Sequence, residues 1–313
     1  MSILITGGTG FIGSYLAHLL VQREKDKVVL LDYFPNMAAV RDLGDRVTVL
    51  RGDFSEATEF MAALKQHDVR DIFHLGYLLS ESERYPAQAI RVNCDGTNRV
   101  FECARIAGVR RVVWASSGAV YGHYHTSASP QWLTEKDPPT ADSVYGACKL
   151  FNENIAEVYR ERYGFDHAAF RFCSVYGLGR GQRRSGSTDV YSALVEKSHA
   201  GEPVSAPPAD HLLSWGYVED AAGALYAAYK APALKSRVFN FTGEPRPVRD
   251  AVERLKELLP KAKISYGTDG VRHIKYMKAD LLREELGFTP RVSMRDGLAD
   301  YVRRLKAGER GVA

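Results

Sequence analysis

Tyr145 and Lys149 lie four positions apart in a stretch with helical periodicity, so both side chains face the same side of the expected helix. A tyrosine phenol has an ordinary pKa of about 10, and a neighbouring ammonium group stabilises its phenolate. Such a pair can exchange a proton with an alcohol. Ser116 and Ser117 end a predicted strand, where a hydroxyl can hydrogen-bond the reacting oxygen. The four residues favour acid–base chemistry at a secondary alcohol, although Tyr-x-x-x-Lys alone also occurs as a surface pair.

A glycine-rich sequence, Gly8-Thr-Gly10-Phe-Ile-Gly13, follows the first predicted strand and opens the first predicted helix. Its glycines allow a tight turn, and the backbone N–H groups of the helix N-terminus attract a pyrophosphate. Asp32 lies nineteen positions after Gly13, where a carboxylate can bond a ribose diol and repel a 2′-phosphate. The pattern predicts NAD rather than NADP, with a purely structural turn as the alternative. Asp53, at the end of the third predicted strand, fits either an adenine contact or a loop cap.

Alternating strands and helices must position these residues. Short apolar runs predict strands at 3–6, 28–32, 47–51, 72–75, 112–116, 168–172 and near 239–241. Helical patterns include Ile12 to Leu20, a stretch opened by Pro86, and 145–162, 218–229, 248–259 and 293–305. Continuous apolar strands between helices indicate an α/β fold with a doubly wound parallel sheet. Residues 177–190 and the proline-rich 203–210 are expected to be irregular.

The sequence predicts two domains. Residues 1–172 form the NAD-binding domain, and residues 212–243 return to it. Residues 173–211 and 244–313 form a smaller, irregular α/β substrate domain. In open α/β sheets, ligands bind outside the carboxyl ends of the strands, so the second domain is expected to lie over that edge.

The composition is that of an ordinary soluble protein: 313 residues, 45% hydrophobic, 26% charged, with a formal net charge of +4. The short Lys/Arg runs do not indicate nucleic-acid binding, and the apolar runs are too short to span a membrane. The amino terminus lacks the features of a signal peptide, so a cytoplasmic protein is expected. The mild positive charge suits an anionic substrate or plain solubility. No metal is expected, because the four cysteines and His74 are scattered over apolar elements.

Eight motifs occur together in chain order, although none is specific alone. They are Gly8-x-Gly10-x-x-Gly13, Asp32, Gly52-Asp53, His74-Leu75-Gly76, Asn93-x-x-Gly96-Thr97, Ser116-Ser117-x-x-Val120-Tyr121-Gly122, Tyr145-x-x-x-Lys149 and Arg171-Phe172-x-x-Val175-Tyr176-Gly177. The chain thereby resembles the extended short-chain dehydrogenase/reductases, also called NAD-dependent epimerases/dehydratases, strongly over residues 1–180. Trp215 to Asp220 and Leu286 to Pro290 match more loosely. The resemblance implies a Rossmann fold.

The resemblance implies a set of cofactor contacts. The pyrophosphate would be lined by Gly7, Gly10, Phe11, Ile12 and Gly13. Asp32 would hold the adenosine ribose, and adenine would be bordered by Asp53 and Phe54. The residues along the rest of the cofactor would be Leu75, Gly76, Tyr77, Asn93 and Cys173, with Asn93 also serving as a helix-bending or active-site support.

The resemblance also implies catalytic roles. Tyr145 would be the acid/base, Ser117 rather than Ser116 the matching hydroxyl, and Lys149 the partner of the nicotinamide ribose. Members of this family are commonly homodimers, so an interface through the helices near 86 and 145 is expected.

The substrate is less clearly indicated. Sugar dehydratases carry an Asp-Glu pair after the serine, whereas this chain has Gly118-Ala119 and therefore no acid there for eliminating water. Nucleotide-sugar 4-epimerases usually have Asn at the position of Ser174 and Arg at that of Leu213, and a leucine cannot pair with a phosphate. Arg180, Arg183 and Arg184 are the candidates to replace that contact.

The favoured alternative is a dehydrogenase of a small hydroxylated substrate such as a sugar acid, polyol or amino alcohol. Gly186-Ser187-Thr188-Asp189 resembles the substrate loop of short-chain-type threonine dehydrogenases, although Ser187 or Thr188 would serve equally well as a helix cap. Substrate contacts are accordingly predicted at Ser174, Arg184, Ser187 and Thr188. A catalytically silent NAD-binding protein is the least favoured reading, since Ser117, Tyr145 and Lys149 are all present. His123, His125 and Trp132 are expected on a loop, with Trp132 as part of a lid.

Overall fold

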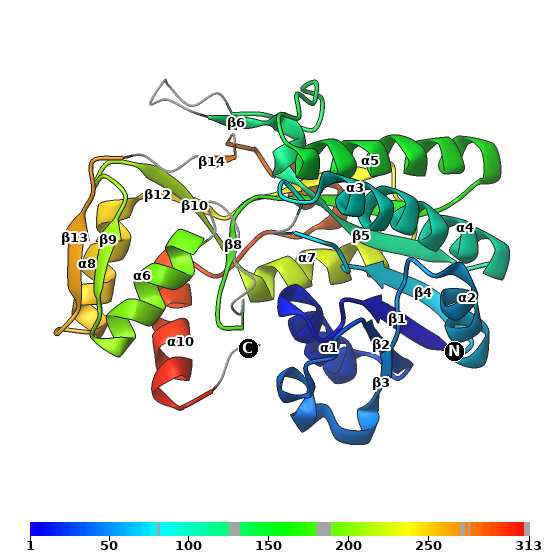
Figure 1. The fold of residues 1–313 in the computed structure, drawn as a ribbon, viewed down its shortest axis with the longest axis horizontal. Coiled ribbons are helices and arrows are strands. Elements are labelled where there is room, and N and C mark those ends of the chain that lie inside the picture. The colour runs from blue at the N-terminus through cyan, green and yellow to red at the C-terminus, as the bar shows by residue number, and fades with distance from the viewer. Residues whose placement is uncertain (80–81, 125–131, 180–188, 270–272, 275, 310–313) are drawn as a thin grey trace.

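The computed structural model describes residues 1–79, 82–124, 132–179, 189–269, 273–274 and 276–309 (Figure 1). Its centre is a seven-stranded parallel sheet in the order β11-β7-β5-β4-β1-β2-β3. The strands are β1 (Ser2–Thr6), β2 (Lys27–Asp32), β3 (Val47–Arg51), β4 (Val69–His74), β5 (Arg111–Ser117), β7 (His167–Phe172) and β11 (Val238–Phe241). The predicted doubly wound sheet is confirmed, with β4 beginning and ending earlier than the sequence indicated.

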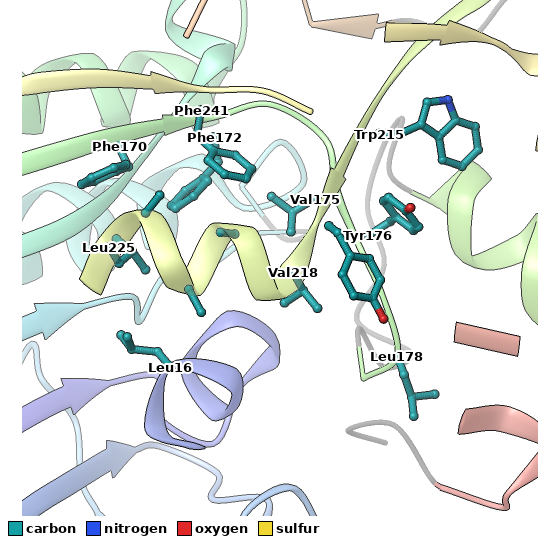
Figure 2. Packing of buried hydrophobic residues seen from close by; sticks show 14 of the residues in the cluster. Leu16, Phe170, Phe172, Val175, Tyr176, Leu178, Trp215, Val218, Leu225 and Phe241 are labelled. Carbon is teal, nitrogen blue, oxygen red and sulfur yellow. The ribbon is translucent and has the colours of Figure 1, made fainter. Parts of the chain in front are cut away.

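Helices cover both faces of this sheet because the side chains of each strand alternate between them. Ile3 and Ile5 belong to the core beneath α1 (Phe11–Arg23) and α7 (Val218–Lys230). Leu4 belongs to the core of the other face, beneath α2 (Ala57–Gln66), α4 (Thr97–Ala107) and α5 (Val144–Tyr163). Figure 2 shows Leu225 of α7 between Leu16 of α1 and the aromatic side chains of the sheet.

The helical stretch opened by Pro86 is not one regular helix. It comprises α3 (Pro86–Ala89), a π-helical segment η3 (Ile90–Gly96) and α4. Within the π segment, the Asn93 carbonyl accepts a hydrogen bond of 2.9 Å from Asn152 Nδ2 on α5. A side chain that takes a helix carbonyl in this way widens the local turn. The segment therefore fastens α5 to the middle of the preceding helix.

The C-terminal part contains more regular structure than predicted. The chain forms a three-stranded sheet, β12-β10-β8, and two strand pairs, β13-β9 and β14-β6. The bounds are β6 (His123–Tyr124), β8 (Val175–Tyr176), β9 (Pro203–Ala206), β10 (Leu212–Tyr217), β12 (Glu244–Pro247), β13 (Lys263–Tyr266) and β14 (His273–Ile274). The expectation of irregular backbone at 203–206 was wrong, because a proline is tolerated as the first residue of a strand in a two-stranded sheet.

The remaining elements are short 3-10 turns and the helices of the C-terminal part. The turns are η1 (Met37–Ala39), η2 (Arg41–Arg46) and η4 (Gly118–Tyr121). The helices are α6 (Asp189–Ala200), α8 (Val248–Leu258), α9 (Asp280–Leu286) and α10 (Met294–Lys306). In the described part of the chain, no helix combines the length and apolar character needed to cross a bilayer.

One hydrophobic core joins the sheet to the C-terminal part. It continues from the α1–α7 face into the aromatic side chains of Tyr176, Tyr191, Trp215 and Tyr217. Figure 2 shows two of them, Tyr176 and Trp215, beyond the end of α7 that carries Val218. The Tyr191 and Trp215 rings meet edge to face with their centroids 4.7 Å apart. The domain boundaries remain a prediction, since the two parts share this core.

A buried ion pair ties α5 to the sheet. Glu153 of α5 and Arg171 of β7 are each no more than 6% exposed, with Arg171 Nη2 2.7 Å from Glu153 Oε2. Arg171 Nε adds a second bond of 3.0 Å to Oε1, and Ser116 Oγ of β5 donates to the same oxygen at 2.5 Å. Arg171 Nη1 also bonds the Tyr121 hydroxyl. One carboxylate thus links α5 with two adjacent strands.

Replacing Arg171 with methionine is expected to lower the free energy of unfolding by about 3–5 kcal/mol, because Glu153 then stays buried without its counter-ion. Urea unfolding followed by circular dichroism measures this. The double variant Arg171→Met with Glu153→Leu removes both charges and is expected to lose less than the single variant. A double variant at least as unstable as Arg171→Met would show that the unpaired charge is not the cause.

Candidate active site

The glycine-rich turn between β1 and α1 is packed too closely for larger residues. Gly7 has a φ of +66°, and a Cβ at Gly13 would lie 2.1 Å from the Gly7 carbonyl oxygen. Gly10 is the N-cap of α1 and supplies no side chain to its first N–H groups. Phe11 and Ile12 begin the helix and pack partly buried against the core. The turn therefore presents backbone N–H groups at a helix N-terminus, which is a binding site for an anionic group.

Asp32 makes a structural contact that the sequence analysis did not predict, while its contact with the adenosine ribose stays a prediction. Its Oδ2 accepts hydrogen bonds from Thr9 N at 2.8 Å and from Thr9 Oγ1 at 2.7 Å. The Thr9 hydroxyl also accepts from Asn36 N at 3.0 Å. The carboxylate at the end of β2 therefore holds the glycine turn in shape. Thr9, at a variable position of the glycine pattern, gave no sequence signal for this contact.

Asp53 acts as a loop cap, the alternative left open by the sequence. Its Oδ1 accepts from Ser55 N at 2.8 Å and from Ser55 Oγ at 2.7 Å. The neighbouring Phe54 ring meets the His74 ring edge to face, with their centroids 4.9 Å apart. The Phe54 ring also packs closely against the Gly76 Cα. The adenine contacts assigned to Asp53 and Phe54 stay predictions.

A chain of hydroxyl and imidazole groups positions the segment that follows β4. Thr6 Oγ1 lies 2.7 Å from His74 Nδ1 and accepts from Gly76 N at 3.1 Å. His74 Nε2 lies 3.1 Å from Thr97 Oγ1 on α4. Burial, together with the nearby charge of Lys149, lowers the pKa of His74 to about 3, so the imidazole is neutral. Leu75 N is bonded to the Thr6 carbonyl, which completes the attachment of this segment to β1.

Asn93 supports the same segment. Its Oδ1 accepts from Leu78 N at 2.8 Å, and its Nδ2 donates to the Leu78 carbonyl at 3.0 Å. The side chain is fully buried in the π-helical segment. These bonds fasten the segment after β4 to the π-helical segment. The role of Asn93 as a helix-bending or active-site support and its contact with the cofactor stay predictions.

The two serines at the end of β5 point to different partners. Ser116 Oγ donates a hydrogen bond to Glu153 Oε1, whereas Ser117 Oγ accepts from Ala119 N at 3.1 Å and caps η4. An accepting hydroxyl keeps its own proton for a further partner. Because successive strand residues face opposite sides, only one of the two serines can face α5 in this way. The role of Ser117 as the matching hydroxyl stays a prediction.

Helix α5 brings Tyr145 and Lys149 to the end of β5. Ser143 caps the helix by accepting from Gly146 N at 3.1 Å, which places Tyr145 in the first turn. Lys149 Nζ bonds the Ala115 carbonyl, two residues before Ser117, and lies 5.8 Å from the centre of the Tyr145 ring. The first turns of α5 therefore lie beside the carboxyl end of β5, the strand that ends at Ser117.

Burial makes the charge of Lys149 costly. The side chain is 3% exposed, and burial lowers its pKa to about 7, while the carboxylate of Glu153 opposes this effect. Glu153 lies one helical turn beyond Lys149, on the same face of α5. The sequence analysis did not single out Glu153, and its only signal was that four-residue spacing.

The predicted substrate positions are only partly described. Ser174 follows β7 and Leu213 lies in β10, and both are buried, with exposed fractions of 1% and 0%. Cys173 is also buried and packs with Val120, Tyr121 and Met277. Arg180, Arg183, Arg184, Ser187 and Thr188 lie outside the described residues, as does His125.

The loop residues considered earlier have partners of their own. His123 Nδ1 lies 2.8 Å from Asp142 Oδ1, and the Trp132 ring lies 5.3 Å from that of Tyr276. Leu133 forms an isolated bridge with Met277. A lid role for Trp132 stays a prediction. Among the described residues, no group of three or more His, Cys, Asp or Glu side chains is arranged to hold a metal ion.

Comparison with known proteins agrees with this geometry. The model of the NAD dependent epimerase/dehydratase family matches residues 3–241. A putative UDP-glucose 4-epimerase of Methanocaldococcus jannaschii is 26% identical, covering 98% of this chain and 99% of that protein. The crystal structure of Thermus thermophilus UDP-glucose 4-epimerase in complex with NAD is 25% identical, with a TM-score of 0.84 over 98% of this chain and 99% of that one.

A further solved structure, a partial consensus L-threonine 3-dehydrogenase, shares the fold at 23% identity. Its TM-score is 0.86, over 98% of this chain and 100% of that one. The family match covers more than half of the chain and includes the glycine turn, the serine strand and helix α5. The family is NAD-dependent and consists of enzymes, as the sequence predicted. The chain belongs to the NAD-dependent epimerase/dehydratase family, within the extended short-chain dehydrogenase/reductases.

Proposed function

We propose that this enzyme catalyses hydride transfer between NAD and a secondary alcohol carbon, with Ser117, Tyr145 and Lys149 acting at the alcohol oxygen. The observation that supports the proposal is the bond from Lys149 Nζ to the Ala115 carbonyl, which joins the first turns of α5 to the carboxyl end of β5, two residues before Ser117. In this fold, that edge of the sheet is where ligands bind.

The residues of the glycine turn fit the cofactor of the family. A Cβ at Gly13 would fill the space beside the Gly7 carbonyl, and α1 begins without a side-chain cap among the described residues. Gly7, Gly10 and Gly13 are therefore proposed to hold the pyrophosphate against the helix N-terminus, and Asp32 the adenosine ribose. NAD, when bound, accepts the hydrogen and two electrons from the substrate carbon.

Tyr145 is proposed to remove the proton from the substrate hydroxyl as the carbon is oxidised. The ammonium group of Lys149 favours the phenolate form of Tyr145 by charge attraction. The Ser117 hydroxyl, which keeps its own proton while accepting from Ala119 N, donates a hydrogen bond to the same substrate oxygen. In the reverse direction, Tyr145 returns the proton.

The proposed substrate is a small hydroxylated molecule such as a sugar acid, polyol or amino alcohol. Leu213 is fully buried and pairs across the sheet with Arg246, whose guanidinium is bonded to Glu244 at 2.6 Å. Ser174 is also buried, and it offers one short hydroxyl. Neither position supplies a charge for a diphosphate, unlike the usual nucleotide-sugar epimerase pattern.

A nucleotide-sugar 4-epimerase is the second candidate, and the similarity to UDP-glucose 4-epimerases over nearly the whole chain favours it. In that reaction, the same three residues would oxidise the sugar hydroxyl and then reduce the ketone on its other face. Dehydration is disfavoured, because Gly118 and Ala119 after the serine are buried and bear no acid.

Incubating the enzyme with free NAD distinguishes the two candidates. Sugar acids, polyols and amino alcohols are tested for NADH absorbance, and UDP-glucose and UDP-glucuronate for epimerised product by chromatography. We expect net NADH formation with one class of small substrate. Conversion of UDP-sugars alone, with no net NADH, would establish the epimerase instead.

Replacing Tyr145 with phenylalanine is expected to lower kcat at least ~100-fold, the usual contribution of a positioned acid/base, while NAD still binds. Stopped-flow turnover and fluorescence titration measure the two quantities. Tyr163→Phe, at the exposed end of the same helix, is the matched control and is expected to retain kcat. Unchanged turnover in Tyr145→Phe would exclude the proton-transfer role.

Replacing Gly13 with alanine is expected to weaken NAD binding at least ~10-fold, because the new Cβ must push α1 away from the Gly7 carbonyl. Equilibrium titration with NAD measures the effect. Gly164→Ala, at a positive-φ position with open space around it, controls for general destabilisation. Equal NAD affinity in Gly13→Ala and the unaltered enzyme would place the pyrophosphate elsewhere.

A further inference from the structure

Tyr77 lies against both proposed catalytic side chains of α5. Lys149 Nζ is 3.3 Å from the centre of the Tyr77 ring, which is within the range of a cation–π contact. The Tyr77 ring also meets the Tyr145 ring edge to face, with the centroids 5.5 Å apart and the planes at 89°. Tyr77 directly precedes Leu78, whose backbone N–H and carbonyl both hydrogen-bond the Asn93 side chain. These bonds restrict where the Tyr77 ring can lie.

In the described part of the chain, few groups stabilise the charge of the Lys149 ammonium group. Its hydrogen bond goes to the Ala115 carbonyl, and the side chain is almost fully buried. The titratable groups that face it are Tyr145, Cys148 and Glu153 on α5, Cys94 on η3, and His74 and Tyr77 at and after the end of β4. Of these, His74 is neutral, and Glu153 is already engaged by Arg171 and Ser116.

We propose that Tyr77 is a positioning residue whose ring face holds the ammonium group of Lys149 in its charged form beside Tyr145. The negative face of an aromatic ring attracts a cation, and the attraction grows when the pair is shielded from water. The inference rests on the role proposed above for Lys149, because a charged lysine is what favours the Tyr145 phenolate.

The proposed contact with Lys149 depends on the aromatic ring of Tyr77 and not on its hydroxyl group. Its Oη is buried and has no hydrogen-bond partner among the described residues. Burial raises the pKa of Tyr77 well above its ordinary value, so the phenol stays neutral and contributes no charge to Lys149. Phenylalanine at position 77 would therefore serve as well as tyrosine, whereas an aliphatic side chain of similar bulk would not.

The direction in which the pKa of Lys149 should change without the ring follows from the form of Lys149 that the ring stabilises. Burial, opposed by the carboxylate of Glu153, brings the pKa of Lys149 to about 7, so a fraction of the amine is neutral at neutral pH. Removing a group that stabilises the cation lowers this pKa further. The alkaline limb of the pH–kcat profile, where Lys149 loses its proton, is then expected to move to lower pH.

Competitive acetylation of the cofactor-free protein tests the proposal directly. Only the neutral amine reacts, so the yield of acetyl-Lys149 against pH, read by peptide mass spectrometry, gives the midpoint of its titration. We expect the midpoint to fall by roughly one pH unit in Tyr77→Leu, the size expected of a shielded cation–π contact. In Tyr77→Phe, it is expected to stay within a few tenths of a unit.

Either of two results would overturn the proposal. A Tyr77→Leu midpoint equal to that of the unaltered protein would show that the ring does not hold the charge. An equal fall in Tyr77→Phe and Tyr77→Leu would assign the effect to the hydroxyl. Tyr77→Met provides a second non-aromatic variant should Tyr77→Leu fold poorly, as judged by circular dichroism. Because labelling needs neither NAD nor substrate, a failure here is distinct from a failure of the proposed reaction.

Discussion

Helix α5 carries an acidic and a basic side chain, Glu153 and Lys149, into the interior, and the arrangement of the site follows from how each is accommodated. Glu153 is paired with Arg171 and accepts from Ser116, so the helix is fastened to β7 and β5. Lys149, one turn earlier, bonds the Ala115 carbonyl and lies beneath the Tyr77 ring. A buried charge without a partner costs several kcal/mol, so these contacts permit few positions of the helix. Tyr145, in the first turn, is positioned as a consequence.

The opposite end of the expected cofactor site is built around the glycine turn. Backbone N–H groups of the glycine turn form its surface, and close packing fixes their positions: Gly13 lies against the Gly7 carbonyl, and Gly7 against Gly76. Asp32 holds the turn through Thr9. The neutral His74, bonded between Thr6 and Thr97, couples the turn to the Tyr77 segment. The two halves of the site therefore share the strands β1 and β4.

Sequence reasoning proposed the reacting groups but not the residues that support them. Tyr145 and Lys149 were proposed because their chemistry demands particular residue types at a particular spacing, and the family resemblance favoured Ser117 over Ser116. Glu153, Thr9 and the ring of Tyr77 were missed as supports, because a glutamate in a helix, a threonine in a turn and a tyrosine after a strand have many ordinary uses. Their importance comes from partners distant in the sequence, such as Arg171 eighteen residues beyond Glu153. Strand β10 was also missed, because Ser214 and Gly216 interrupt its apolar run.

The sequence by itself determined the parallel sheet, the glycine turn with its acidic partner, and the family, because hydrophobic periodicity and motif spacing are local properties of the chain. Only the tertiary structure decided which serine faces α5, that Asp53 caps its own loop, and that an aromatic ring covers the lysine. It also decided that Leu213 is buried in β10 rather than open to a ligand. Each of these depends on strand register and on packing between distant segments, and a linear pattern does not encode the distances that such contacts require.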